Sequence, residues 1–291
     1  MRLVASRPNA ESLPPDVAAR LAGVTPALLR DLVAQVAVPR PRGSAGHAAV
    51  RRVVTDRLAE IVGAAAVRVD GAGNVLAGNP GAARILIGAH YDSVPGTPAA
   101  DDNASGVAAV IAAARAVGPM QDVCYALFDG EESGFLGSRA LVAGLGRHAP
   151  AEVHVLDTVG YASRAAGSQR NPIPGLSAPD VGDFLALVAT SAAVPALERV
   201  MAAADGHGVP VQALFLPDAP IEAVGKVSPH LLRSDHATFW RAGRPAVFWT
   251  DTAEFRNPHY HRSSDMPDTL DYVFLAGVAR LLAHAVLSEE G

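Results

Sequence analysis

The sequence contains a single cysteine, Cys124, so the chain cannot form an intramolecular disulfide. It has no apolar run of the roughly 18 residues that a membrane-spanning helix requires, and the N-terminal segment MRLVASRPNAESLPPD lacks the apolar centre of a secretory signal. The arginines are scattered and the net charge is −5, so no basic patch indicates a nucleic-acid partner. From these absences we expect a cytoplasmic protein that binds neither nucleic acid nor membrane.

Apolar residues make up 49% of the 291 residues and charged residues 18%, a composition typical of a folded chain with a large core. The sequence shows no internal repeat and no low-complexity linker. We therefore expect one domain over residues 1–291, with residues 1–31 as a peripheral N-terminal helical extension. Ten histidines and 29 acidic residues permit a metal site without indicating one. The oligomeric state cannot be read from the sequence.

Short apolar runs alternate with longer helical patterns along the chain. The runs predict strands at residues 67–70, 74–77, 85–89, 124–128, 153–156, 209–216 and 246–249, the first two as a hairpin. The longer patterns predict helices at residues 16–37 with a break near Thr25, and at 47–61, 105–117, 136–145, 181–192, 235–242 and 270–287. This alternation predicts an α/β fold with a mixed, mostly parallel central sheet and helices on both faces.

Polar side chains follow several of the predicted strands directly. His90 follows one strand, Glu131 and Glu132 come shortly after the next, and Asp157 and Asp251 come after two more. In an open α/β sheet, ligands bind outside the carboxyl ends of the strands. We therefore expect these side chains to converge on one crevice.

Two further acidic pairs favour a metal site in that crevice. Asp101 and Asp102 precede a predicted helix in DDNASG, and a capping role would explain only one of them. An aspartate at a helix N-terminus is well placed to bridge two cations. The adjacent Glu131 and Glu132 would repel each other if buried without cations. Metal-assisted hydrolysis uses histidine and carboxylate ligands and one unbound carboxylate as base, and neighbouring glutamates can divide those roles.

Six motifs together resemble the di-zinc aminopeptidases, metallopeptidase family twenty-eight, in order and spacing. They are GAHYDSVPG (88–96), DDNASG (101–106), FDGEESGFLGS (128–138), LDTVGY (156–161), RSDHATFWRAGRPAVFWT (233–250) and YHRSSDMPDTLD (260–271). The resemblance extends from about Leu32 to the C-terminus and includes no protease-associated insert. It implies the zinc-aminopeptidase fold of phosphorylase/hydrolase type. It also implies a hydrolase that cleaves a peptide or small amide, most often by removing N-terminal residues from peptides.

The resemblance also implies two Zn²⁺ ions and their ligands. One zinc is bound by His90 and Asp157, the other by Glu132 and His261, and Asp102 bridges the two. In relatives the peptide bond after the bridging aspartate is commonly cis.

Five more residues take roles by the same resemblance. Glu131 takes a proton from the metal-bridging water and passes it to the leaving amine. Asp92 orients the histidine ligand of the first zinc, and Tyr260 polarises the scissile carbonyl. Asp235 and His236 help to hold the substrate or the oxyanion.

Two other functions stay open at this point. A glutaminyl-cyclase-like transferase would share the FDGEE stretch but would use one zinc, and GFLGS and DDNASG favour the hydrolase. A non-catalytic binding relative would usually have lost ligands, whereas the five ligands and the base are all present. Specificity is expected from the Pro- and Gly-rich segments 162–179 and 215–232, so aminopeptidase, dipeptidase and hydrolase of a modified small amide are not separated.

Overall fold

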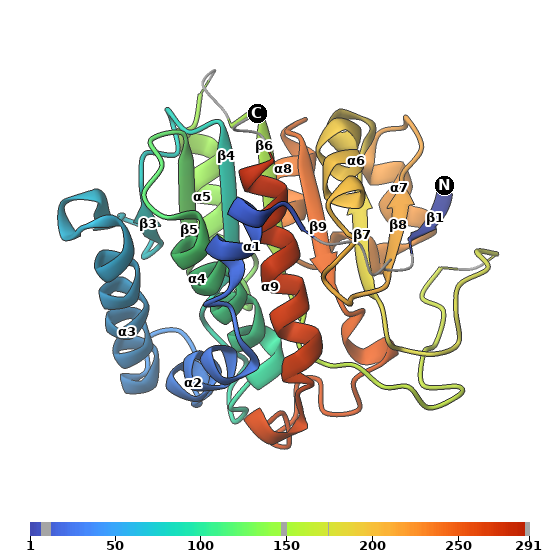
Figure 1. Ribbon diagram of the computed structural model, residues 1–291, viewed down its shortest axis with the longest axis horizontal. Helices are drawn as coiled ribbons and strands as arrows, with labels where there is room; N and C mark the ends of the chain where they lie inside the picture. The colour runs from blue at the N-terminus through green and yellow to red at the C-terminus, as the bar shows by residue number, and fades with distance from the viewer. Residues whose placement is uncertain (7–12, 147–149, 174, 289–291) are drawn as a thin grey trace.

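The structure, a computed structural model, describes residues 1–6, 13–146, 150–173 and 175–288. In these residues nine strands form one sheet in the order β1-β8-β7-β9-β6-β4-β5-β3-β2 (Figure 1). The strands are β1 (Arg2–Ser6), β2 (Val67–Val69), β3 (Val75–Ala77), β4 (Ile85–His90), β5 (Val123–Phe128), β6 (Glu152–Leu156), β7 (Leu185–Ala189), β8 (Val211–Phe215) and β9 (Ala246–Thr250).

The sheet is mixed. Strands β5, β4, β6 and β9 are parallel neighbours at its centre, and β7 and β8 are parallel to each other. The remaining pairs, β1 with β8, β2 with β3, β3 with β5 and β7 with β9, are antiparallel. The predicted α/β class with a mixed central sheet and the predicted hairpin are therefore confirmed.

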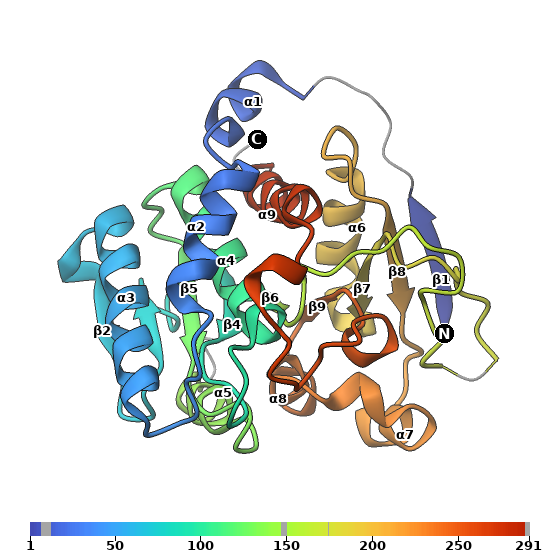
Figure 2. The same cartoon turned by 90° about the horizontal axis from the view of Figure 1, so that it is seen from below.

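Helices cover both faces of the sheet (Figure 2). One face carries α1 (Pro15–Leu21), α2 (Pro26–Val36), α3 (Ala45–Val62), α4 (Gly106–Val117), α6 (Val194–Ala202) and α9 (Tyr272–Leu287). The other carries α5 (Leu136–Gly144), α7 (Ile221–Val227) and α8 (His236–Arg241). A separate hydrophobic core fills each side. Within the described residues, every helix falls short of the length or the apolarity needed to cross a membrane.

The central strands are buried on both faces, as their sequences predict. All residues of β4 (ILIGAH) and β5 (VCYALF) are buried, which is typical of parallel strands between two layers of helices. Gly88 is required where these strands meet, because a Cβ atom there would lie 2.5 Å from the Phe128 ring and 2.7 Å from the Ala126 carbonyl oxygen. The close fit fixes the register that brings the ends of the two strands together.

One prediction about a segment is wrong. Residues 181–192 do not form a helix, because Leu185–Ala189 is strand β7 between β8 and β9. The run LALVA fits a buried helix or a buried strand equally well, and pairing with two neighbours decides between them. In residues 1–31, which we expected as a peripheral helical extension, the structure places α1 and most of α2. Arg2–Ser6 also extends the sheet at β8, and Leu29 of α2 is buried in the main core.

Candidate metal centre

The five expected metal ligands lie at one edge of the sheet. His90 is the last residue of β4, Glu132 follows β5, and Asp157 comes directly after β6. Asp102 lies in the segment before α4, where the Asp102–Asn103 peptide bond is cis. His261 comes from the long connection between β9 and α9. Parallel strands thus place three of the ligands, and two loops bring the others to them.

The carboxylate of Asp102 stands between two histidines. Its Oδ1 atom lies 3.2 Å from Nε2 of His90, and its Oδ2 atom lies 2.9 Å from Nε2 of His261. On one side Nε2 of His90 is 3.6 Å from Oδ1 of Asp157, and on the other Nε2 of His261 is 3.7 Å from Oε1 of Glu132. The donors therefore form two groups that share one carboxylate.

Donor atoms of this site fit divalent cations. Oxygen or nitrogen atoms of His90, Glu131 and Asp157 lie within 4.8 Å of one another, and so do those of Asp102, Glu132 and His261. Buried polar atoms are normally hydrogen-bonded. Yet both ring nitrogens of His90 and Oε1 of Glu132 are buried without a hydrogen-bond partner among the described residues. Histidine nitrogens and carboxylate oxygens are the ligands that zinc takes in catalytic sites.

Crowding of carboxylates shifts their protonation. Burial, with Asp102 nearby, raises the pKa of Glu132 to about 8. Burial also raises the pKa of Glu131 well above its usual range, although His90 opposes the change. Burial alone would raise the pKa of Asp102 as well, but the close imidazoles of His261 and His90 hold it below its usual range. A bound cation favours the ionised carboxylates in such a cluster, so protonation and metal binding compete here.

Asp92 ties the first histidine to the two glutamates. Its Oδ1 atom accepts a hydrogen bond from the backbone N–H of Glu131 at 3.1 Å, and its Oδ2 atom accepts one from Glu132 at 3.2 Å. Oδ1 also lies 3.5 Å from Nδ1 of His90. The carboxylate therefore positions the backbone after β5 relative to the end of β4, as expected of a residue that orients the ligand.

Sequence reasoning missed two residues that hold the loops of the site. Asp265 accepts hydrogen bonds from the backbone N–H groups of Asp101 at 2.9 Å and Asp102 at 3.2 Å. Arg40 is fully buried and donates to carbonyl oxygens within residues 91–99 at 2.6–2.9 Å. Asp265 stands inside the motif YHRSSDMPDTLD, but the partners of both residues are backbone atoms that no side-chain pattern identifies.

Tyr260 lies beside the second metal group. Its ring stacks on His261 with centroids 3.9 Å apart and planes 16° apart. Its phenolic oxygen accepts a hydrogen bond from Nη2 of Arg233 at 3.2 Å, and Arg233 is also paired with Glu254. The phenol is thus held at the rim of the site by a metal-ligand candidate on one side and a cation on the other.

The side chains of Asp235 and His236 lie in different environments, although the two residues are adjacent in sequence. Asp235 is fully buried, and burial raises its pKa to about 7 against the opposing effect of His90. The ring of His236 lies in the core, stacked on Phe248 at 3.8 Å, and its Nε2 donates to the carbonyl oxygen of Leu231 at 2.9 Å. Asp235 is therefore within electrostatic reach of the metal groups, whereas His236 is occupied by packing.

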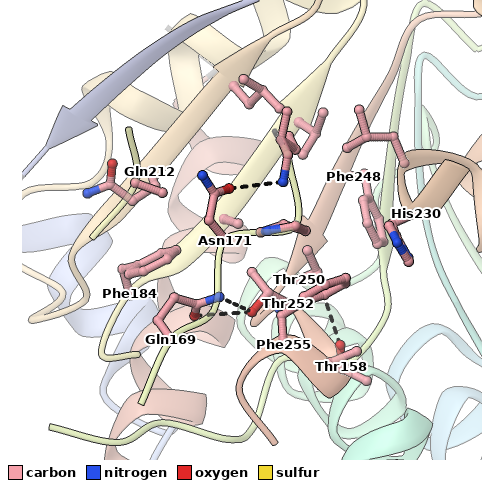
Figure 3. A pocket seen from close by; sticks show the side chains of 18 of the residues that line it. Thr158, Gln169, Asn171, Phe184, Gln212, His230, Phe248, Thr250, Thr252 and Phe255 are labelled. Atoms are coloured by element: carbon pink, nitrogen blue, oxygen red, sulfur yellow. Dashed lines mark hydrogen bonds between the residues drawn. The ribbon is translucent and has the colours of Figure 1, made fainter. Parts of the chain in front are cut away.

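A mainly apolar pocket opens beside the metal centre (Figure 3). It contains about 930 Å³ of empty space, part of which is open to solvent, and Asp157 and Tyr260 belong to its lining. The segments 162–179 and 215–232, which we expected to border the crevice, both contribute to its walls; residue 174 lies outside the described residues. The pocket is thus continuous with the candidate site.

Comparison with known proteins agrees with this geometry. The sequence profile of Peptidase family M28 matches residues 74–286. The chain is 36% identical over 214 residues to the uncharacterized protein YfbL of Escherichia coli (strain K12), covering 67% of this chain and 63% of that protein. It is 27% identical over 222 residues to a probable leucine aminopeptidase of Arthroderma otae, covering 68% of this chain and 52% of that protein. The chain therefore spans only part of the length of these curated relatives.

Solved structures share the fold. The LapA aminopeptidase of Legionella pneumophila superposes with a TM-score of 0.68 at 18% identity, covering 97% of this chain and 77% of that one. A glutaminyl cyclase of Macrostomum lignano superposes with a TM-score of 0.67 at 17% identity, covering 97% of this chain and 95% of that one. At such identities the likeness concerns the fold, and both hydrolases and cyclases adopt it.

Proposed function

Because the chain belongs to Peptidase family M28, we propose that it is a zinc-dependent aminopeptidase that removes N-terminal residues from peptides or cleaves a related small amide. One observation carries this proposal. The two carboxylate oxygens of Asp102 face two different histidines, each accompanied by a further carboxylate. That arrangement supports two cation positions with a shared ligand, a layout that suits two-metal hydrolysis.

Each ion has its own ligands in this proposal. His90 and Asp157 would hold one Zn²⁺, Glu132 and His261 would hold the second, and Asp102 would serve both. Bound zinc lowers the pKa of water and polarises a carbonyl group. The chain supplies the shape of the site, because Asp92, Asp265 and Arg40 fix the loops that carry the ligands.

The remaining residues carry the proton and the substrate. Glu131 is buried next to His90 and Asp157 and is not needed as a ligand, so it accepts a proton from the attacking water and delivers it to the leaving amine. Tyr260 donates a hydrogen bond to the oxygen of the scissile carbonyl. Asp235 lies near enough to Glu131 to add to the rise of its pKa, so it supports the base rather than holding substrate. We assign His236 to packing.

Two matched variants test the proposal. Glu131→Gln keeps the shape of the side chain and removes the proton acceptor, so zinc content should stay near two per chain while kcat falls by about 10²–10⁴. Glu132→Gln weakens a ligand, so its lost activity should partly return with excess zinc. The assay is hydrolysis of aminoacyl-p-nitroanilides, with zinc measured by elemental analysis. Loss of zinc in Glu131→Gln, with Glu132→Gln metallated and inactive, would reverse the two roles.

Because a glutaminyl cyclase has the same fold, a glutaminyl-cyclase-like transferase is the alternative function. A cyclase of that type would release ammonia from an N-terminal glutamine and would use one zinc. The paired carboxylate oxygens of Asp102 favour two ions instead. One zinc per chain, together with ammonia release from glutaminyl peptides and no cleavage of aminoacyl-anilides, would replace the aminopeptidase proposal with the cyclase.

A further inference from the structure

The floor of the apolar pocket is made by neighbouring strands in register. Thr250 of β9 lies opposite Ala186 of β7, which lies opposite Gln212 of β8, and all three line the pocket. A second row runs parallel to the first and also lines the pocket; it consists of Phe248, Val188, Leu214 and Leu3, on β9, β7, β8 and β1. The two rows thus form a floor that runs across the strands from β9, which lies next to β6 and Asp157, toward β8 and β1.

The first row of residues is open on β7 and β8, toward one edge of the sheet. Ala186 and Gln212 are half-buried, whereas Leu185, Leu187 and Ala213, on the opposite face of the same strands, are fully buried. Figure 3 shows Gln212 at the end of the pocket opposite to Thr158. The methyl group of alanine leaves room between Thr250 and Gln212. The open strip is therefore a groove whose floor carries a small residue between Thr250 and Gln212.

The interior of the groove is mainly apolar, and the polar side chains that also line it, among them Gln169, Asn171 and Gln212, are uncharged. The charged and titratable side chains of its lining are at the mouth, near the metal centre, and they are Asp157, His230, Arg233, Glu254 and Tyr260. Arg233 and Glu254 are paired with each other. The opposite wall consists largely of Ile173, Leu176, Phe184 and Phe255. A charged group would lose hydration in this interior without gaining a partner, so the occupant must be apolar.

The groove is longer than one amino-acid side chain. Three strand spacings separate β6, where Asp157 follows, from β8, where Gln212 lies, which gives about 14 Å at roughly 4.8 Å per spacing. An extended chain advances about 1.2 Å per bond, so a leucine side chain reaches roughly 4 Å from its α-carbon. At that advance, a straight chain of about 8 carbons would be needed to reach Ala186 on β7, two strand spacings away, and about 12 carbons to reach Gln212 on β8.

We propose that this groove is a subsite for an unbranched alkyl chain on the acyl side of the scissile amide. The inference rests on the proposed aminopeptidase function and names its substrate class: amides whose acyl part carries a long straight apolar chain. Hydrolysis adds water across the C–N bond, which yields the long-chain carboxylate and a free amine and needs no other reactant. Substrates that begin with leucine or phenylalanine fill only the part of the groove nearest the metal centre.

A chain-length series tests the proposal. The substrates are p-nitroanilides of 2-aminoalkanoic acids with straight side chains of two to ten carbons, assayed with zinc. Each added methylene that enters the groove should raise kcat/KM by about fourfold, up to about eight carbons or more. An optimum at four carbons or fewer would overturn the inference while leaving the aminopeptidase function intact.

Ala186 provides the matched perturbation. Ala186→Phe fills the groove between Thr250 and Gln212, so kcat/KM for the ten-carbon substrate should fall about 50-fold or more, the worth of three or more buried methylenes. The two-carbon substrate should lose much less, because its side chain does not reach Ala186, and circular dichroism shows that the variant is folded. Ala186→Leu should have a smaller effect in the same direction. Ala192→Phe is the control, because Ala192 is exposed. Equal losses on short and long substrates would contradict the groove.

A binding measurement separates this inference from the catalytic proposal. The free 2-aminoalkanoic acids are titrated calorimetrically into the wild-type protein and Ala186→Phe. If the groove holds the alkyl chain, Kd should fall about fourfold per methylene in the wild type and level off early in the variant. Affinity independent of chain length would overturn the groove even in an active enzyme. Chain-length-dependent binding without hydrolysis would overturn only the proposed function.

Discussion

Arg233 and Tyr260 lead to a prediction in which two side chains act as one unit. Arg233 donates to the phenolic oxygen of Tyr260 at 3.2 Å. Because an arginine has no acceptor atom, the phenolic hydrogen must point elsewhere. The ring that carries it is stacked on His261, an expected metal ligand. We therefore expect Tyr260 to donate to the scissile carbonyl oxygen, with Arg233 holding the phenol in that orientation.

The two side chains should differ in the size of their effects. Removing one donor to a developing oxyanion costs about 10²–10³ in kcat, so Tyr260→Phe should lower kcat by about 10². A hydrogen bond to a charged group is worth about 1.5–3 kcal/mol. The Arg233 side chain is 41% exposed and shared with Glu254, which reduces its contribution to about 1 kcal/mol. Arg233→Met should therefore lower kcat by about fivefold.

A double-mutant cycle measures whether Arg233 acts through Tyr260. The kcat values of wild type, Tyr260→Phe, Arg233→Met and the double variant are compared on one anilide substrate. In the phenylalanine background the Arg233 substitution should have almost no further effect, and Arg233→Lys should recover part of the loss in the wild-type background. Arg241→Met is the control, because Arg241 has a similar exposure and pairs with Glu222. Independent effects that multiply would refute the coupling, and an unaffected Tyr260→Phe would refute the oxyanion role.

Three further predictions concern the support of the site and the stability of the fold. Asp265→Ala releases the backbone that carries the bridging aspartate, so zinc affinity should fall about 10–100-fold in a chelator-competition titration; unchanged affinity would show that the loop holds without it. Gly88→Ala forces a Cβ atom against Phe128, so urea unfolding should show a loss of about 1–3 kcal/mol; wild-type stability would mean that β4 and β5 shift apart easily. Burial lowers the pKa of His236 to about 3, below its ordinary value of 6.5. The unfolded chain therefore binds more protons below pH 6.5, and metal-free wild type should lose about 1.4 kcal/mol per pH unit there through this residue. His236→Gln lacks that loss, so the stability gap between the two proteins should narrow from pH 7 to pH 4.5 in chemical denaturation, and a constant gap would contradict a neutral buried imidazole.

The edge of the sheet that carries the metal groups could be predicted because the rule behind it is local. His90, Glu132 and Asp157 each follow an apolar run that is too short for a helix. Parallel strands between two helical layers must end on the same side. No long-range contact has to be known for this step. Interior placement of β4, β5, β6 and β9 follows from their continuous apolar sequences, and the structure confirms it.

The residues that fix the loops of the site could not be predicted from local sequence patterns of this kind. Asp265 acts on backbone N–H groups more than 160 positions earlier in the chain, and Arg40 acts on carbonyl oxygens more than 50 positions later. Backbone atoms are the same at every position, so the sequence carries no complementary pattern that would identify the partner. Asp235 and His236 also show that sequence position alone does not tell where a side chain lies. They are adjacent in sequence, and only the orientation of α8 separates a carboxylate near the metal groups from an imidazole in the core.

The wrong assignment of residues 181–192 also explains why substrate preference could not be read from the sequence. In a helix, Ala186 would have neighbours three and four positions away and no fixed relation to β9 or β8. In strand β7 it stands between Thr250 and Gln212 and lines the pocket, where we propose that its small side chain leaves room for a long alkyl chain. The property that matters for specificity is therefore a register among three strands separated by long connections. Composition cannot encode that register, and a substitution at one alanine tests it directly.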